Sequence, residues 1–223
     1  MARHQTSRAL LLCGALAPLI FTSAWIIGTL VQKGYSIRRE DISALAALDA
    51  EHPWIMIAGF ALSGALTTAF AVAVCSCLPR SRVASALVAL AGLGMIALGL
   101  LRNDCSTETE ACKARITAGE VSWHHDAHDV LSAPVFAAAV VAPLLLAPRF
   151  RMELRLKALA AYSVTSAAAL ATLFALGGLD AVPGWDGAVQ RASVSLALLW
   201  LEVVALCLLA RTSSRVSAAA ATS

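Results

Sequence analysis

The residues best suited to chemistry lie in segment 122–129, where three histidines and two aspartates fall within eight positions. His124 and His128 are four residues apart, a spacing that places both imidazoles on one face of a helix. Two such imidazoles, completed by a carboxylate, can hold a zinc or copper ion. The same residues would also suit a polar helix start, with Ser122 as N-cap. The sequence favours the polar helix start over the metal site somewhat, because it offers no diagnostic third metal ligand.

A second group of candidates comes from residues at the ends of apolar segments. Asp104, His128, Asp129 and Arg191 follow or precede the third, fourth and sixth of these segments. If the segments pack together, the acids and His128 would form an acid/base cluster. Arg191 would then hold an anionic head group such as phosphate. An ion pair of Arg191 with Asp104 or Asp129 would instead make the cluster a structural clasp between helices. The two interpretations carry similar weight.

The apolar segments themselves predict the fold. Of 223 residues, 59% are hydrophobic and 14% charged, whereas soluble domains carry about a quarter charged residues. A membrane span needs about 20 apolar residues. Six stretches qualify, which predicts an all-α, six-span membrane domain over residues 1–212 and a disordered tail over 213–223. The bilayer is the expected partner, and no basic run with interleaved aromatics indicates nucleic acid. The predicted spans are residues 9–31, 55–78, 83–101, 130–147, 158–179 and 192–210.

The distribution of charge predicts the orientation. With the N-terminus inside, the inner segments hold ten basic residues and one acid, Glu153, while the outer segments hold seven basic residues and twelve acids. Dense Lys and Arg in short loops mark the cytoplasmic side. We therefore expect a multi-pass protein of the cytoplasmic (cell) membrane with both termini in the cytoplasm. Cys105 and Cys112 then lie in an outer loop, where they can form a disulfide.

One charge falls within a span. Glu202 lies in the sixth apolar stretch, and an intramembrane carboxylate is a candidate functional residue by default. It could be protonated and bonded to a hydroxyl of a neighbouring helix, such as Thr165 or Ser166. No second deep charge would complete a proton relay, which argues against an ion-coupled transporter.

Several short motifs together resemble the domain-of-unknown-function 998 family of bacterial membrane proteins. The resemblance runs from about residue 12 to residue 209 and is specific as a set. It implies six spans and an actinobacterial source, and it implies no activity. It also draws attention to Tyr35, Asp41 and Gln190 beside Arg191 as candidate substrate-binding residues. The motifs are Gly34-Tyr35, Asp41-Ile42-Ser43-Ala44-Leu45, Pro53-Trp54, Gly59-Phe60, Arg102-Asn103-Asp104, Trp123, His128-Asp129, Gln190-Arg191 and Trp200.

Three functions are compatible with these residues. The first is an accessory, sensor or binding module whose outer loops contact a lipid, peptide or protein partner. The second is a membrane-embedded enzyme acting on a lipid or isoprenoid at the outer leaflet, with zinc or copper as a candidate cofactor. The third, a small-solute transporter, is the least favoured, because no inverted repeat or broken helix pair is evident.

Overall fold

The computed structural model is all-helical over the residues that it describes. It describes the backbone of residues 2–179 and 181–220, and the side chains of residues 7–154, 156–179 and 181–212. The elements are α1 (Ala2–Val31), the 3-10 helix η1 (Ile42–Ala46), α2 (Pro53–Cys77), α3 (Arg82–Leu100), α4 (Glu110–Thr117), α5 (Trp123–Arg151), the 3-10 helix η2 (Leu154–Leu156), α6 (Lys157–Gly178) and α7 (Asp186–Ala220).

Six of these helices are long and apolar enough to cross a membrane, which confirms the predicted number of spans. The fourth and sixth begin earlier than predicted, at Trp123 and Asp186. Their first turns are polar, and hydropathy alone leaves such turns out of a span. The disordered tail predicted over residues 213–223 lies outside the described side chains, and its last three residues lie outside the described backbone, so that prediction stays open.

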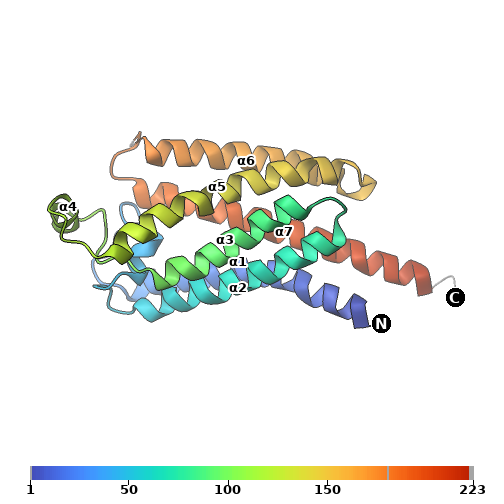
Figure 1. Cartoon of the computed structure of the whole chain (residues 1–223), viewed down its shortest axis with the longest axis horizontal. Coiled ribbons are helices and arrows are strands. Elements are labelled where there is room, and N and C mark those ends of the chain that lie inside the picture. The colour runs from blue at the N-terminus through green and yellow to red at the C-terminus, as the bar shows by residue number, and fades with distance from the viewer. Residues whose placement is uncertain (1, 180, 221–223) are drawn as a thin grey trace.

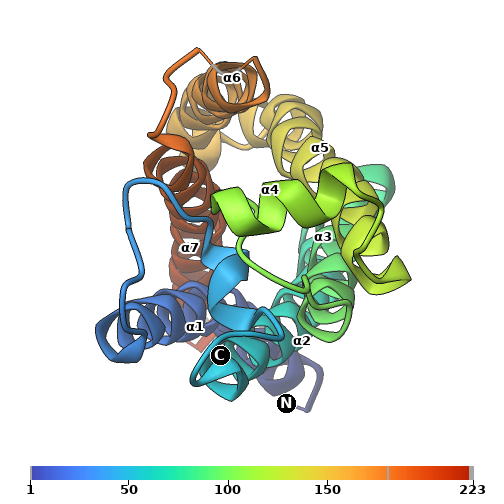
Figure 2. The ribbon, with the colours of Figure 1, turned by 90° about the vertical axis from the view of Figure 1, so that its left-hand side faces the viewer.

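The six long helices form a closed ring in the order α1, α2, α3, α5, α6, α7, with α7 returning to α1. The two ends of the chain lie together at one end of the bundle (Figure 1). Figure 2 looks at the opposite end, where α4 and the segment that contains η1 lie across the ring. We call this the loop end, and the other the terminal end.

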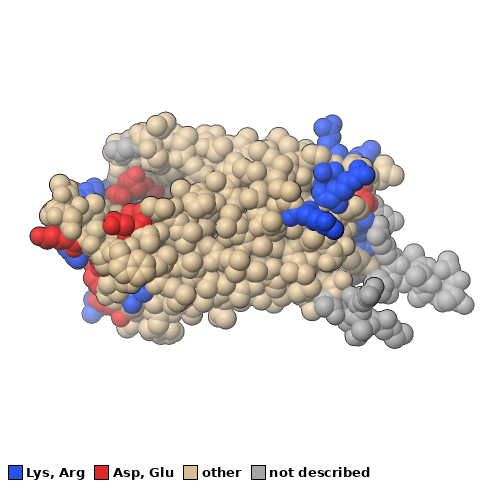
Figure 3. All heavy atoms as spheres, in the orientation of Figure 1, with Lys and Arg blue, Asp and Glu red and all other residues tan. Residues whose placement is uncertain are grey.

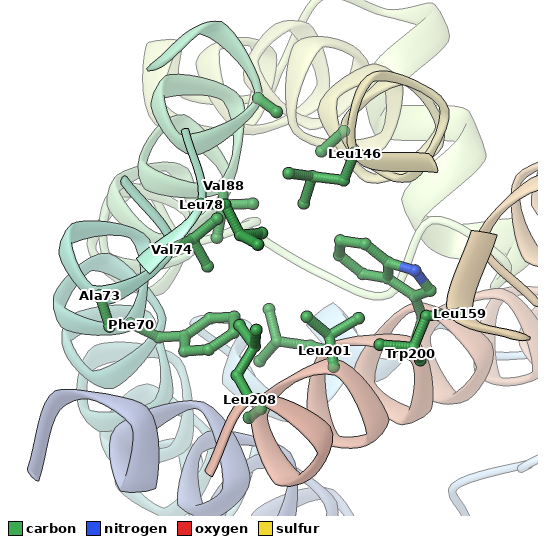
Figure 4. Packing of buried hydrophobic residues seen from close by; sticks show 14 of the residues in the cluster. Phe70, Ala73, Val74, Leu78, Val88, Leu146, Leu159, Trp200, Leu201 and Leu208 are labelled. Atoms are coloured by element: carbon green, nitrogen blue, oxygen red, sulfur yellow. The ribbon is translucent and has the colours of Figure 1, made fainter. Parts of the chain in front are cut away.

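The interior is packed by small and branched side chains from all parts of the ring. At the centre, the buried indole of Trp200 in α7 donates a hydrogen bond to Ser163 Oγ in α6 at 2.9 Å, and Figure 4 shows this indole among leucines of the core. Between α2 and α3, a Cβ added to Gly92 would lie 2.7 Å from the carbonyl oxygen of Gly64. Glycine there lets two membrane helices approach closely.

On the face that Figure 3 shows, charged side chains gather at the two ends, with an uncharged belt between them. In this view the terminal end is mainly basic, whereas the loop end carries most of the acidic groups. The bundle therefore has the charge asymmetry expected from the sequence.

Candidate functional site

The first loop at the loop end, residues 32–52, folds inward over the end of the bundle. All five residues of η1 are buried, and Ile42 and Leu45 pack with Phe21 and Met56 of α1 and α2. This segment is a 3-10 helix that ends at Ala46, and it is buried because its apolar side chains complete the core.

Arg191 fixes this loop to α7. Its guanidinium is buried, with 6% of the residue exposed, and its Nη1 lies 2.9, 2.7 and 2.8 Å from the carbonyl oxygens of Ile37, Glu40 and Gly187. Its Nη2 donates to the hydroxyl of Tyr35, which in turn donates to the carbonyl of Asp41 at 2.8 Å. Burial raises the pKa of the Tyr35 phenol, so this hydroxyl keeps its proton.

Two further side chains hold the same loop. Gln190 Oε1 accepts the backbone N–H of Ile42 at 2.7 Å. Arg102 donates to the carbonyls of Ala46 and Ala47, both at 2.7 Å. We call Tyr35, Arg102, Gln190 and Arg191 the loop latch. The backbone contributes as well, because the N–H groups of residues 187 and 188 donate to the carbonyls of residues 39 and 38.

The second loop at this end, residues 101–122, is organised around Asp104. The Cys105–Cys112 disulfide that we predicted is present and ties this loop to α4. The carboxylate of Asp104 is buried, accepts the backbone N–H of Ser122 and lies 3.8 Å from Arg115. The hydrogen bond from Ser122, assisted by Arg115, holds the pKa of Asp104 below its usual range. Asp104 is thus an ionised anchor for the chain entering α5.

The three histidines at the start of α5 have different surroundings. His124 stacks on Trp123, with ring centroids 3.9 Å apart. His128 Nδ1 lies 2.6 Å from the carbonyl oxygen of Leu101. His125, only 1% exposed, accepts the backbone N–H of Asp104 at its Nδ1. Among the described residues, no group of three or more His, Cys, Asp or Glu side chains is found that could hold a metal ion. The helix begins at Trp123 with Ser122 in the N-cap position, but the Ser122 side chain makes no capping hydrogen bond.

The expected cluster of Asp104, His128, Asp129 and Arg191 does not form as a unit. Asp104 pairs with Arg115, and Asp129 lies 3.9 Å from His125 Nε2. Arg191 is bonded to loop 32–52. The ion pair of Arg191 with Asp104 or Asp129, one of the two interpretations left open by the sequence, is not among the described contacts, because the inward fold of this loop supplies backbone carbonyls that sequence spacing does not reveal.

A cleft opens between α5, α6 and α7 at the loop end. Its volume is 530 Å³. Its apolar wall includes Phe136 of α5 and Phe174 of α6, whose ring centroids are 4.8 Å apart. Three acids line it: Asp41, Glu108 and Asp186. Gln190 and Ser193 add polar groups from α7.

The charge of the cleft is one-sided. Among the described residues that line it, none is a lysine or arginine, although Lys113 Nζ lies 3.8 Å from the carboxylate of Glu108. Burial, followed by the neighbouring charge of Glu108, raises the pKa of Asp41 from its ordinary value of 3.8 to about 7. A carboxylate perturbed in this way, in a cleft, is typical of a functional site.

The structure therefore groups the candidate substrate-binding residues into two overlapping sets. Asp41 and Gln190 line the cleft, whereas Tyr35 and Arg191 belong to the loop latch, and Gln190 takes part in both. Glu108 and Asp186 were missed by sequence reasoning. Asp186 stands four residues before Gln190, and this spacing on α7 was a usable signal that they share a helix face.

Glu202 lies apart from both sets. It is half-buried in the middle of α7. The hydroxyl of Thr165, one of its two expected partners, donates to the carbonyls of Ala161 and Tyr162 in its own helix. Both of these hydrogen bonds of the Thr165 hydroxyl stay within α6, and neither involves Glu202.

Six apolar helices and two folded loops at one end define a multi-pass α-helical membrane protein. Residues 15–207 match the model of a family described as proteins of unknown function, DUF998. The chain belongs to this family, as the resemblance of its motifs predicted. No curated protein and no solved structure matches the chain.

Proposed function

We propose that this protein is a membrane-embedded binding module whose ligand occupies the cleft between α5, α6 and α7. The ligand is an amphiphile with a cationic head group. The observation that carries the proposal is the cleft itself, in which an apolar wall meets three carboxylates. Large apolar pockets with a few convergent polar groups are the usual form of small-molecule sites.

The two parts of the cleft suit the two parts of such a ligand. An alkyl or isoprenoid chain would pass from the bilayer into the space between the helices. There it would contact Phe136, Phe174 and Leu173 and stay out of water. The cationic head would meet Asp41, Glu108 and Asp186 at the mouth. Opposite charges attract strongly in surroundings with little water.

The placement of the other candidates supports binding rather than catalysis or transport. Arg191, expected to hold a phosphate, is bonded to the loop, and the mouth of the cleft would repel an anion. Asp104 and His128, the candidate acid/base groups, are bonded to the backbone of loop 101–122, at Ser122 and at Leu101. In this proposal, Arg191, Asp104 and His128 hold the loops and helices that surround the cleft in place.

We further propose that the loop end faces outward from the cytoplasmic membrane and that both termini are cytoplasmic. The basic terminal end supports this orientation, as does the disulfide at the opposite end. A green fluorescent protein fused after Ser223 is expected to fluoresce, and alkaline phosphatase at the same place to be inactive. Active phosphatase at this position would contradict the orientation.

Binding of a cationic amphiphile is the test of the proposed function. With the protein in nanodiscs of zwitterionic lipid, dodecyltrimethylammonium is expected to bind saturably and about tenfold or more tightly than dodecyl phosphate. Asp186→Asn is expected to weaken binding of the cation about tenfold, which is 1.4 kcal/mol for the lost charge. Equilibrium dialysis against empty nanodiscs measures both.

Asp126→Asn provides a matched control. Asp126 also lies in the first turn of a spanning helix at the loop end, but it is exposed and does not line the cleft. Its substitution is expected to leave the affinity unchanged. Equal affinity for the cationic and anionic probes, or equal losses in the two variants, would overturn the proposed site.

A further inference from the structure

A second groove lies at the terminal end, between α5 and α6, far along the bundle from the acidic cleft. Its volume is 820 Å³. Leu144 and Pro148 of α5 and Val164 of α6 contribute to its wall. Leu144 and Val164 are 43% and 48% exposed, so the groove opens sideways, toward the region where lipid surrounds the bundle. An apolar chain would fit against this wall.

Two cations among the described side chains lie at the head of the groove. Arg151 is the last residue of α5 and Lys157 the first residue of α6, and both line the groove and are exposed. Glu153, the acid of the connecting turn, is engaged by Arg211 at 2.8 Å. The positive charge of Arg151 and Lys157 is therefore left facing the groove.

We propose that this groove binds an anionic phospholipid, with an acyl chain along α5 and α6 and the phosphate between Arg151 and Lys157. Guanidinium and ammonium groups are the side chains that recognise phosphate. Basic pockets between spanning helices are suited to anionic lipid head groups. The charge at the head of the groove and the apolar wall below it match the two parts of one phospholipid. The proposal is independent of the acidic cleft, since the two sites share no residue.

Native mass spectrometry with phosphatidylglycerol and phosphatidylcholine tests the site. The wild-type protein is expected to retain phosphatidylglycerol about tenfold more strongly than phosphatidylcholine. The double variant Arg151→Gln/Lys157→Gln is expected to lose this preference. The matched double variant Arg80→Gln/Arg82→Gln removes two exposed cations of the α2–α3 turn and is expected to keep it. Loss of the preference in both double variants, or in neither, would overturn the site.

A variant that blocks the groove and a competitor without acyl chains test the apolar wall separately from the two cations. Val164→Trp fills the groove without changing charge and is expected to abolish retention, which tests the site even if the charge variant folds poorly. Retention unchanged in Val164→Trp would overturn the proposal. Glycerol phosphate, a head group without chains, is expected to leave the bound lipid in place. Displacement by glycerol phosphate would mean that the groove recognises a soluble phosphate and not a phospholipid.

Discussion

Replacing Arg191 with alanine is expected to lower the free energy of unfolding by about 3–5 kcal/mol, the cost of breaking a buried charged network. The guanidinium donates to the carbonyls of Ile37, Glu40 and Gly187 and to Tyr35. Without it, each of these buried or part-buried oxygens loses one donor, which leaves polar groups with fewer partners than they have in water. Loop 32–52 should then detach from α7, and its backbone should become accessible to protease.

Thermal unfolding in detergent and limited proteolysis of residues 32–52 measure these effects. Arg39→Ala is the control, because Arg39 lies in the same loop but is exposed. Arg191→Lys is expected to be intermediate, since an ammonium keeps the charge and cannot reproduce the planar set of donors. If Arg191→Ala unfolds at the same temperature as Arg39→Ala, the loop latch does not hold the loop.

The second large effect is the dependence of stability on pH that Asp41 imposes. Its pKa is raised from 3.8 to about 7 on folding. Between these two pKa values, the folded protein holds a proton that the unfolded chain releases. The free energy of unfolding therefore falls as the pH rises through this window, and the whole destabilisation by the ionised Asp41 is present above about pH 7. Asp41→Asn removes the titrating group. The free energy of unfolding of this variant is expected to exceed that of the wild type by about 1–4 kcal/mol at pH 8 and to equal it near pH 4.

The same titration should govern ligand binding. Because the quaternary ammonium probe keeps its charge, any change in affinity between pH 6 and pH 8 reports on the protein. Affinity of the wild type is expected to rise as Asp41 ionises, while Asp41→Asn should bind weakly and almost equally at both values. Asp126→Asn is expected to keep the wild-type pH dependence. If the stability and the ligand affinity of Asp41→Asn change with pH as they do in the wild type, a group other than Asp41 titrates.

The sequence predicts the bundle well because its signal is local. Six long apolar stretches suffice for six spans, and the asymmetry of Lys and Arg is visible without a structure. The errors lie where polar residues continue an apolar helix. Trp123 and Asp186 begin helices that hydropathy starts several residues later, because a helix gains its backbone hydrogen bonds whether its first turn is polar or apolar.

The candidate site was predicted only in part, since it depends on contacts across long stretches of sequence. Arg191 meets Tyr35, which lies 156 positions earlier, and no periodicity encodes that pairing. His125 illustrates a different limit. The spacing of His124 and His128 suggests a shared face, yet His125 and His128 are the buried pair, because the adjacent loop covers that side of α5. The spacing of His125 and Asp129, which are four residues apart, was the sequence signal that these two residues share a face of α5.

The central claim, a cationic amphiphile in the cleft between α5, α6 and α7, is tested most directly by photocrosslinking. A diazirine on the alkyl chain of a quaternary ammonium probe is expected to label peptides of all three helices near Phe136, Phe174 and Val189. Ala137→Trp, which fills the cleft from an exposed position, should abolish the labelling. Labelling spread evenly around the six spanning helices, or unchanged in Ala137→Trp, would contradict the claim.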